Sequence, residues 1–152
     1  MVEPATMNDA DEICQLVNHY AEREVMLHRS LESVYENLRD FLVCRRDGQF
    51  AGCIALAVSG RQLGEIRSLA VAPAVLGQGV GAELVRAAIE DGRELGMNRV
   101  FALTYVPEFF ARFGFRVVDR ETLPNKVWRD CIHCPRADNC QEVAVVLELA
   151  DL

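Results

Sequence analysis

The sequence feature that most constrains the fold is a set of three glycines at every second position: Gly77, Gly79 and Gly81 in "AVAPAVLGQGVGAELVRAAIEDG". The apolar stretch before them is typical of a strand, and the apolar residues after them recur at helical spacing. A strand that runs through glycines into a helix presents backbone N–H groups and the positive end of the helix dipole, which together bind phosphate. A flexible glycine-capped loop is the alternative, and the spacing must decide between them.

The spacing of the glycines excludes two common phosphate-binding motifs. A dinucleotide fingerprint needs G-x-G-x-x-G and an acidic residue at the end of the next strand, whereas this chain has G-x-G-x-G and no acid in 99–105. A nucleotide-triphosphate loop needs a lysine directly after its glycines, and Lys126 is the only lysine among the 16 basic residues. The loop must therefore bind a different ligand, or no ligand.

Periodicity and turn residues predict an alternation of strands and helices along the chain. We expect a strand near 2–6, a helix over 8–22 after a capping signal from Thr6 to Asp9, and a second helix from Ser30 to Asp40. Asp47-Gly48 predicts a tight turn within a strand pair. A strand at 63–73, the glycine-led helix capped by Gly96, and a strand at 99–105 indicate a parallel crossover. A short helix at 107–113, a strand at 115–119, an irregular segment over 121–141 and a final strand follow.

Bulk composition sets broad limits on organisation and partners. With 152 residues and 51% hydrophobic composition, we expect one domain over 1–152. The sequence has no apolar run long enough for a membrane span, and its acidic start lacks the pattern of a signal peptide, so we expect a cytoplasmic protein without a membrane partner. The formal net charge of −7 argues against a nucleic-acid partner. Any anion-binding site must therefore rely on local groups and not on the overall charge of the protein.

Three of the six cysteines lie together in a late polar stretch: Cys131, Cys134 and Cys140. A structural zinc site normally has four ligands, and His133 is poorly placed to complete this set. A metal site and thiols that pack an irregular loop both remain open, and we favour the thiols, with no metal required.

Beyond these local signals, "EIRSLAVAPAVLGQGVGAELV", followed by "FFARFGF", resembles the signature region of the GNAT superfamily of acyl-CoA-dependent N-acetyltransferases. The resemblance implies an α/β (α+β) fold: a central mixed, mostly antiparallel sheet with a splayed parallel strand pair and flanking helices. In that family, Q/R-x-x-G-x-G/A opens a helix whose backbone amides hold the coenzyme A pyrophosphate. Gly79 and Gly81 match its glycines, and Leu76 replaces the preferred arginine or glutamine.

Softer motifs are similar to the short, stand-alone N-acetylglutamate synthases of bacterial arginine biosynthesis: "MLHRS", "GEIRSLAV", "FALT" and "LPNKVWRDCIHCPRADNC". This likeness implies acetyl-CoA as co-substrate and L-glutamate as acceptor. Another amine, such as a different amino acid, a polyamine or a protein N-terminus, is an alternative. A non-catalytic coenzyme A-sensing module is a second alternative, favoured by Phe110 at the position where family members often have a tyrosine acid. We also consider a homodimer.

The resemblance also implies site residues. In the family, a glutamate at the position of Glu65 takes the amine proton, although Glu65 and Arg67 on one strand face could simply neutralise each other. Tyr105 could protonate the leaving thiolate, or it could be a packed ring. The residues expected to contact the coenzyme are Leu69, Ala70, Val71, Gly77, Gln78, Gly79, Val80, Gly81, Ala82 and Phe110.

The acceptor side needs cations because glutamate carries two carboxylates. Arg29 and Arg67 are the preferred carboxylate ligands, Lys126 is a weaker third, and the likeness places Thr104 with them. Each cation taken alone could equally be a solvated surface charge.

Overall fold

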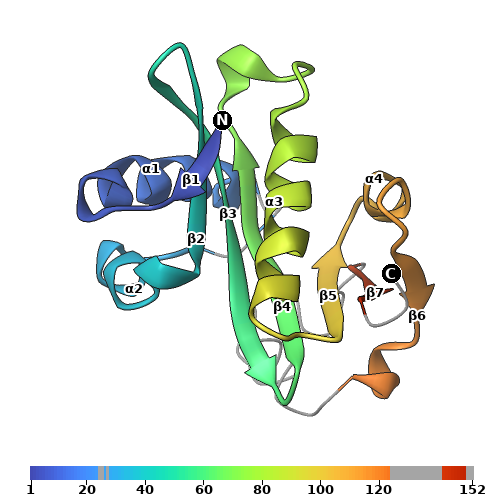
Figure 1. Cartoon of the computed structure of the whole chain (residues 1–152). Coiled ribbons are helices and arrows are strands. Elements are labelled where there is room, and N and C mark those ends of the chain that lie inside the picture. Colours follow the sequence, from blue (N-terminus) through green and yellow to red (C-terminus); the bar gives the residue numbers. More distant parts are fainter. Residues whose placement is uncertain (24–25, 27, 124–141, 150–152) are drawn as a thin grey trace. The chain divides into compact units, whose positions relative to one another are not determined.

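The computed structural model describes residues 1–23, 26, 28–123 and 142–149 (Figure 1). Its strands are β1 Val2–Pro4, β2 Phe41–Arg46, β3 Gln49–Gly60, β4 Leu63–Val71, β5 Arg99–Thr104, β6 Arg116–Val118 and β7 Val143–Glu148. Its α-helices are α1 Ala10–Ala21, α2 Leu31–Glu36, α3 Val80–Glu94 and α4 Pro107–Ala111. Short 3-10 turns lie at Met7–Asp9, Leu38–Asp40, Pro73–Val75 and Arg120–Thr122.

The strands form one mixed sheet in the order β1-β2-β3-β4-β5-β7-β6. Strand β5 runs parallel to β4, with Leu63–Ile66 opposite Arg99–Ala102, and antiparallel to β7. The pairs β1–β2, β2–β3 and β6–β7 are antiparallel. The predicted mixed, mostly antiparallel sheet with one parallel pair and flanking helices is confirmed.

Packing divides the chain into two compact units. The first unit comprises Met1–Leu56 and Arg67–Asp91, and the second comprises Ala57–Ile66 and Gly92–Leu152. Strands β3 and β4 and helix α3 therefore each contribute to both units.

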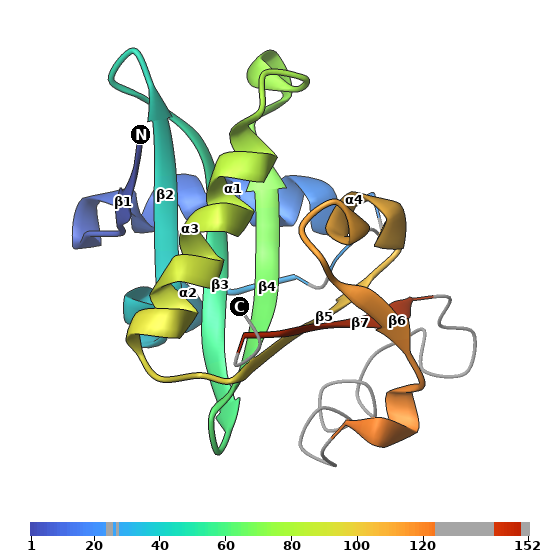
Figure 2. The ribbon, with the colours of Figure 1, turned by 45° about the vertical axis from the view of Figure 1, so that its right-hand side comes forward.

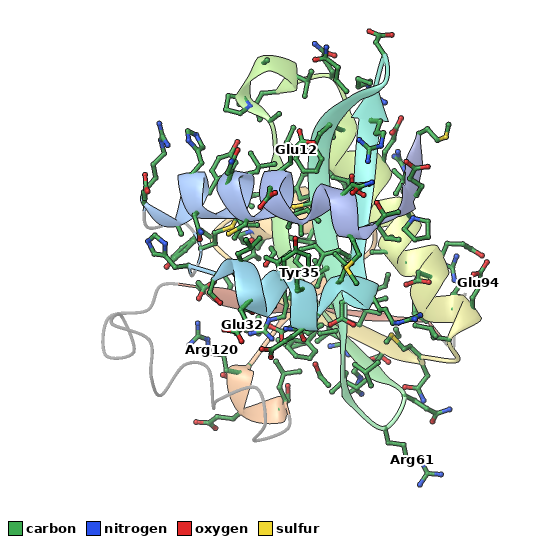
Figure 3. All side chains as sticks on the ribbon, turned by 90° about the vertical axis from the view of Figure 1, so that its left-hand side faces the viewer. Glu12, Glu32, Tyr35, Arg61, Glu94 and Arg120 are labelled. Atoms are coloured by element: carbon green, nitrogen blue, oxygen red, sulfur yellow. The ribbon has the colours of Figure 1, made fainter. Side chains whose placement is uncertain are left out.

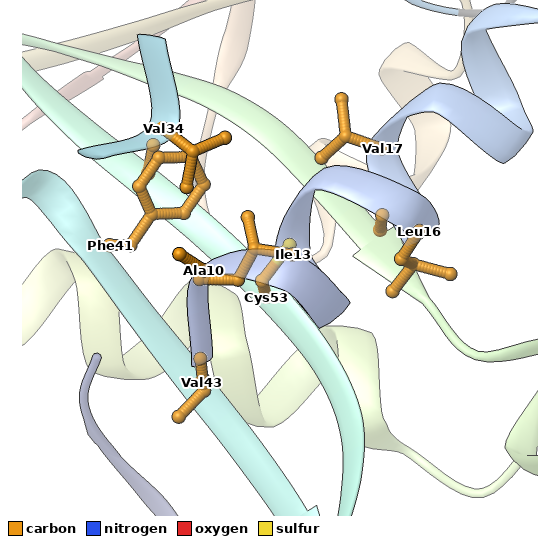
Figure 4. Close-up of a cluster of buried hydrophobic side chains, with 10 residues drawn as sticks. Ala10, Ile13, Leu16, Val17, Val34, Phe41, Val43 and Cys53 are labelled. Atoms are coloured by element: carbon orange, nitrogen blue, oxygen red, sulfur yellow. The ribbon is translucent and has the colours of Figure 1, made fainter. Parts of the chain in front are cut away.

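In the first unit, helices cover both faces of the strands (Figure 2). Helices α1 and α2 lie side by side on one face (Figure 3), where Ile13 and Val34 meet Phe41 and Cys53 from the strands in a buried cluster (Figure 4). On the other face, a Cβ on Gly52 of β3 would lie 2.7 Å from the Ala70 carbonyl oxygen of β4 and 3.1–3.2 Å from side-chain atoms of α3. Glycine at this position therefore leaves room for the backbone of β4 and for the helix that packs on the sheet.

The turn between β2 and β3 is the one that Asp47-Gly48 predicts. Asp47 and Gly48 have φ of 52° and 77°, the left-handed pair that a two-residue hairpin turn of this twist requires. Arg45 and Arg46, just before the turn, point to opposite faces, as side chains along a strand must. Arg45 pairs with Asp9 and Glu3, whereas Arg46 pairs with Glu83 of α3.

The second unit is built around β5 and β7. Phe101 on β5 is fully buried and packs with Leu63, Ala144 and Val146 in one cluster. Gly92, late in α3, lies close to this unit's apolar residues, since a Cβ there would be 3.4 Å from the Met97 sulfur. The predicted helix end is also present: Gly96 has φ of 87°, the left-handed conformation expected of a C-terminal cap.

The second helix is shorter than its apolar spacing predicts. The Ser30 hydroxyl caps it by accepting from the Ser33 N–H at 3.0 Å, as expected, but the helix ends at Glu36 rather than at Asp40. The Asn37 side chain donates to the Ser33 carbonyl at 2.8 Å. The Asn37 N–H also makes its helical bond to this carbonyl, at 3.1 Å, but Asn37 has φ of −113° and ψ of 19°, outside the helical region. The α-helix therefore ends there, and a 3-10 turn follows. Among the residues that the structure describes, no helix is long and apolar enough to cross a membrane.

Candidate functional site

The glycine loop of the first unit connects β4 to the N-terminus of α3. Gly77 and Gly79 have φ of 82° and 83°, angles that side-chain-bearing residues rarely adopt, whereas Gly81 already lies inside the helix. A Cβ on Gly77 or Gly79 would contact nothing within 4 Å, so the backbone angle alone calls for glycine. The loop residues Gly77–Gly79 are exposed, and the first N–H groups of α3 have no acceptor within the helix, an arrangement suited to phosphate.

Two side chains hold the end of β4, where Leu69–Val71 are predicted to contact the coenzyme. Ser68 has φ of 52°, an unusual angle for a non-glycine residue inside a strand. Cys53 donates its thiol to the Ser68 carbonyl at 3.5 Å, and Tyr20 donates its hydroxyl to the Val71 carbonyl at 2.6 Å. Burial raises the pKa of Cys53 to about 12, so it stays a neutral thiol. The backbone on both sides of Leu69–Ala70 is thus anchored.

Arg29 is held at its backbone by a side chain of α1. The Asn18 amide accepts from the Arg29 N–H at 2.8 Å and donates to the Arg29 carbonyl at 2.8 Å. The Cys14 thiol also lies 3.6 Å from that carbonyl. The Arg29 guanidinium lies 5.1 Å from the centre of the fully buried Phe41 ring. Both its backbone and its side chain are therefore oriented by the surrounding fold.

The charges of both predicted carboxylate-binding arginines act on Asp40. Burial raises the pKa of the Asp40 carboxyl, the charges of Arg29 and Arg67 oppose that shift, and the charge of Asp91 adds to it. Both arginines are half-buried in the first unit, although they lie far apart in the sequence. Two guanidinium ions and two carboxyl groups therefore lie within electrostatic reach of one another in this part of the first unit.

The second unit contains the other predicted residues that the structure describes. Glu65 and Tyr105 are half-buried on β4 and just after β5. Thr104 is buried, and its hydroxyl oxygen accepts from the Val106 N–H at 2.9 Å. Phe110 on α4 is also buried and meets Phe115 edge to face, with ring centres 5.2 Å apart.

Lys126 and the late cysteines Cys131, Cys134 and Cys140 lie outside the described residues. Within the described ranges, no group of three or more His, Cys, Asp or Glu side chains is arranged to hold a metal ion. The three cysteines that the structure places, Cys14, Cys44 and Cys53, are free thiols.

Sequence reasoning missed Asn18, Asp40 and Tyr20, which contact or act on predicted site residues. Asn18 and Tyr20 lie on the first predicted helix, where polar and aromatic residues normally need no special explanation. Asp40 was interpreted only as a helix end. No local pattern marks these residues, because their partners come from distant segments.

Comparisons with known proteins agree with this architecture. The acetyltransferase (GNAT) family model matches residues 7–115. An uncharacterised N-acetyltransferase of Chlorobaculum tepidum is 41% identical over 148 residues, which cover 97% of this chain and 96% of that protein. The amino-acid acetyltransferase of Mycobacterium tuberculosis is 39% identical over 122 residues, 78% of this chain and 70% of the relative.

Structural similarity extends over almost the whole chain. N-acetylglutamate synthase from Neisseria gonorrhoeae, solved in complex with coenzyme A and N-acetyl-glutamate, matches with a TM-score of 0.87 and 30% identity. The match covers 98% of this chain but only 35% of that longer protein. The chain thus belongs to the acetyltransferase (GNAT) family, as an acetyl-CoA-dependent N-acetyltransferase related to the amino-acid acetyltransferases.

Proposed function

We propose that this enzyme transfers the acetyl group of acetyl-CoA to the α-amino group of L-glutamate. The observation that carries the proposal is that Arg29 and Arg67, which lie far apart in the sequence, both act electrostatically on Asp40 in the first unit. Guanidinium binds carboxylate with two parallel hydrogen bonds, so two arginines in one partly buried region suit an acceptor with two carboxylates. A polyamine would need the opposite charge in its pocket.

Related proteins support an amino-acid acceptor. The mycobacterial relative is named an amino-acid acetyltransferase, and the gonococcal synthase was solved with N-acetyl-glutamate. Acetylation of glutamate would give the enzyme a role in bacterial arginine biosynthesis in the cytoplasm.

On the donor side, we propose that the backbone of Gly77–Ala82 holds the phosphates of the coenzyme. The open space at Gly77 and Gly79 and the N-terminus of α3 fit such a group, which supplies the acetyl thioester when bound. Backbone N–H groups of Leu69–Val71 would stabilise the negative charge that develops on the thioester oxygen. The bonds from Cys53 and Tyr20 would keep that backbone in place.

For proton transfer, we propose that Glu65 takes the proton of the attacking amine, directly or through a water molecule. A thiol of pKa about 8.5 can leave as an anion near neutral pH, so the phenylalanine at 110 is compatible with turnover. Tyr105 remains the proposed donor if the thiolate is protonated on the enzyme.

The acceptor is tested by thiol release from acetyl-CoA with a panel of amines: L-glutamate, L-glutamine, L-aspartate, spermidine and a peptide with a free N-terminus. We expect the highest kcat/KM with L-glutamate. A higher value with spermidine or the peptide would overturn the proposal for glutamate, and a higher value with L-glutamine would show that the side-chain carboxylate is not recognised.

The base is tested with Glu65→Gln, which preserves size and hydrogen bonding but cannot accept the proton. We expect kcat to fall at least tenfold and the pH dependence of the rate to change over roughly pH 6 to 9. Glu108→Gln, a matched change at an exposed position of the second unit, should leave both unaltered. An unchanged rate for Glu65→Gln over that pH range would show that Glu65 is not the base.

A further inference from the structure

The glycine loop has little packing to hold its shape. Gly77, Gln78 and Gly79 are exposed, and open space surrounds both glycines where a side chain would begin. The bonds from the Gln78 N–H to the Val75 carbonyl and from the Leu76 N–H to the Pro73 carbonyl are long, at 3.3 and 3.4 Å. Glycine loses more conformational freedom on ordering than any other residue. A loop of this kind binds phosphate well only if another group holds it in shape.

Arg46 of β2 makes the contact that could do this. One guanidinium nitrogen, Nη2, donates to the Gln78 carbonyl at 3.1 Å, between the two left-handed glycines. The other, Nη1, donates to both carboxylate oxygens of Glu83 at 3.0 and 3.1 Å. Because the guanidinium is planar and rigid, one side chain ties the loop to the first turn of α3.

Charge around Glu83 gives Arg46 a second effect. A carboxylate in the first turn of a helix interacts favourably with the helix dipole, but it repels any phosphate bound at the same end of the helix. Glu83 accepts a hydrogen bond from the Cys44 thiol at 3.3 Å, and the N-terminal ammonium of Met1 lies 3.6 Å away. The Cys44 hydrogen bond and then Arg46 lower the pKa of Glu83, which is therefore ionised at neutral pH. Arg46 offsets the negative charge beside the loop.

We propose that Arg46 is a positioning residue for the coenzyme: it fixes the Gln78 carbonyl and neutralises Glu83, so that the loop N–H groups are already arranged when phosphate arrives. This inference rests on the proposed function of Gly77–Ala82 as the phosphate-binding loop. Pre-organisation increases affinity by reducing the ordering that binding requires. Arg46 therefore acts on donors that carry phosphate and on no others.

Two acetyl donors test this in Arg46→Ala. Acetyl-CoA carries the phosphates, whereas S-acetylpantetheine presents the same thioester without them. With acetyl-CoA, we expect KM to rise roughly tenfold and kcat to stay within about twofold, the size expected for losing a hydrogen bond from a charged group. With S-acetylpantetheine, kcat/KM should not change. An equal loss with both donors, or no loss with either, would overturn the proposal.

Two further variants control for charge and folding. Arg46→Lys keeps the charge but cannot bridge Gln78 and Glu83 with one planar group, so its KM for acetyl-CoA should fall between wild type and Arg46→Ala. Arg45→Ala removes the same charge from the neighbouring residue on the opposite face of β2. It should lower Tm, because the buried Asp9 carboxylate loses its partner, yet leave KM for acetyl-CoA unchanged. A rise in KM for Arg45→Ala equal to that for Arg46→Ala would show that the effect is not specific to the loop.

Gly79→Ala separates this inference from the function on which it depends. If Gly79→Ala raises KM for acetyl-CoA but not for S-acetylpantetheine while Arg46→Ala changes neither, the loop binds phosphate and the role of Arg46 is refuted. If Gly79→Ala affects both donors equally or neither, the loop is not the phosphate site, and the proposed function of the loop fails with the inference.

Discussion

The proposed donor loop and the proposed acceptor region differ in which atoms would recognise the ligand. The loop at Gly77–Ala82 would use backbone N–H groups within a single stretch of chain, shaped by two left-handed glycines. The acceptor region would use the side chains of Arg29 and Arg67, whose charges act on Asp40 only in the folded first unit. Recognition by backbone depends on local conformation, whereas recognition by side chains depends on packing. The two sides should therefore respond to different mutations.

The largest effect that should separate the two regions is expected from Arg29→Ala. Loss of a half-buried guanidinium that pairs with a carboxylate should raise KM for L-glutamate about hundredfold, while KM for acetyl-CoA stays within about twofold. Steady-state kinetics with each substrate varied in turn measures both values. Arg23→Ala, an exposed arginine after α1 that contacts His19, serves as the control and should change neither. An unchanged KM for glutamate in Arg29→Ala would remove Arg29 from the acceptor site.

Gly79→Ala is expected to raise KM for acetyl-CoA and to leave KM for glutamate unchanged, the reverse of Arg29→Ala. A left-handed alanine costs roughly 1–2 kcal/mol, and the methyl group would stand in the open space proposed for phosphate. KM for acetyl-CoA should rise about tenfold, with KM for glutamate unaffected.

Gly48→Ala is the matched control for this change. Gly48 has φ of 77° and the same open surroundings, but it lies in the β2–β3 turn. Both variants should lose a similar free energy of unfolding in denaturant titrations. If both also raise KM for acetyl-CoA, the effect reflects general destabilisation rather than the loop.

A smaller effect on the acceptor side is expected from Asn18→Ala. This change removes the two hydrogen bonds that hold the Arg29 backbone but leaves the guanidinium in place. KM for glutamate should rise roughly fivefold, with KM for acetyl-CoA unchanged. Asn37→Ala removes a comparable amide from the end of α2 and should leave both KM values as they are. Equal effects of the two variants would mean that Asn18 only stabilises the fold.

Asp9→Asn is expected to change neither KM. It should instead change how the free energy of unfolding depends on pH. Burial raises the pKa of Asp9, but hydrogen bonds from the Thr6 N–H and Arg45 outweigh it, and the net pKa is lowered. A carboxyl with a lowered pKa in the folded state stabilises the protein above its unfolded pKa of about 3.9, and this stabilisation is lost as the pH falls through the folded value.

Asp9→Asn should lower the unfolding free energy at neutral pH by the roughly 1.5–3 kcal/mol typical of a hydrogen bond to a charged group. The difference from wild type should shrink below about pH 4. Urea titrations at several pH values measure it. A difference that does not depend on pH would contradict the assignment of this stability to the ionised carboxylate.

Much of the fold could be predicted because its signals are local. Asp47-Gly48 requires two left-handed residues and therefore a tight hairpin, and Gly96 ends α3 for a similar reason. The end of α2 differs from the prediction because the apolar spacing continues past Asn37, whereas the backbone of Asn37, with φ of −113° and ψ of 19°, leaves the helical region. Periodicity reports which face of a helix is buried, but it does not report where the backbone leaves the helical conformation.

The sequence by itself determined the glycine loop, since left-handed glycines before a helix specify backbone geometry without reference to the rest of the chain. Only the tertiary structure decided that the charges of Arg29 and Arg67 act on Asp40, that Asn18 holds Arg29, and that Arg46 rather than Arg45 reaches the loop. Adjacent residues of a strand point to opposite faces, so strand register and the helices that cover each face determine which arginine meets which partner. That information lies in packing between distant segments and not in any local pattern.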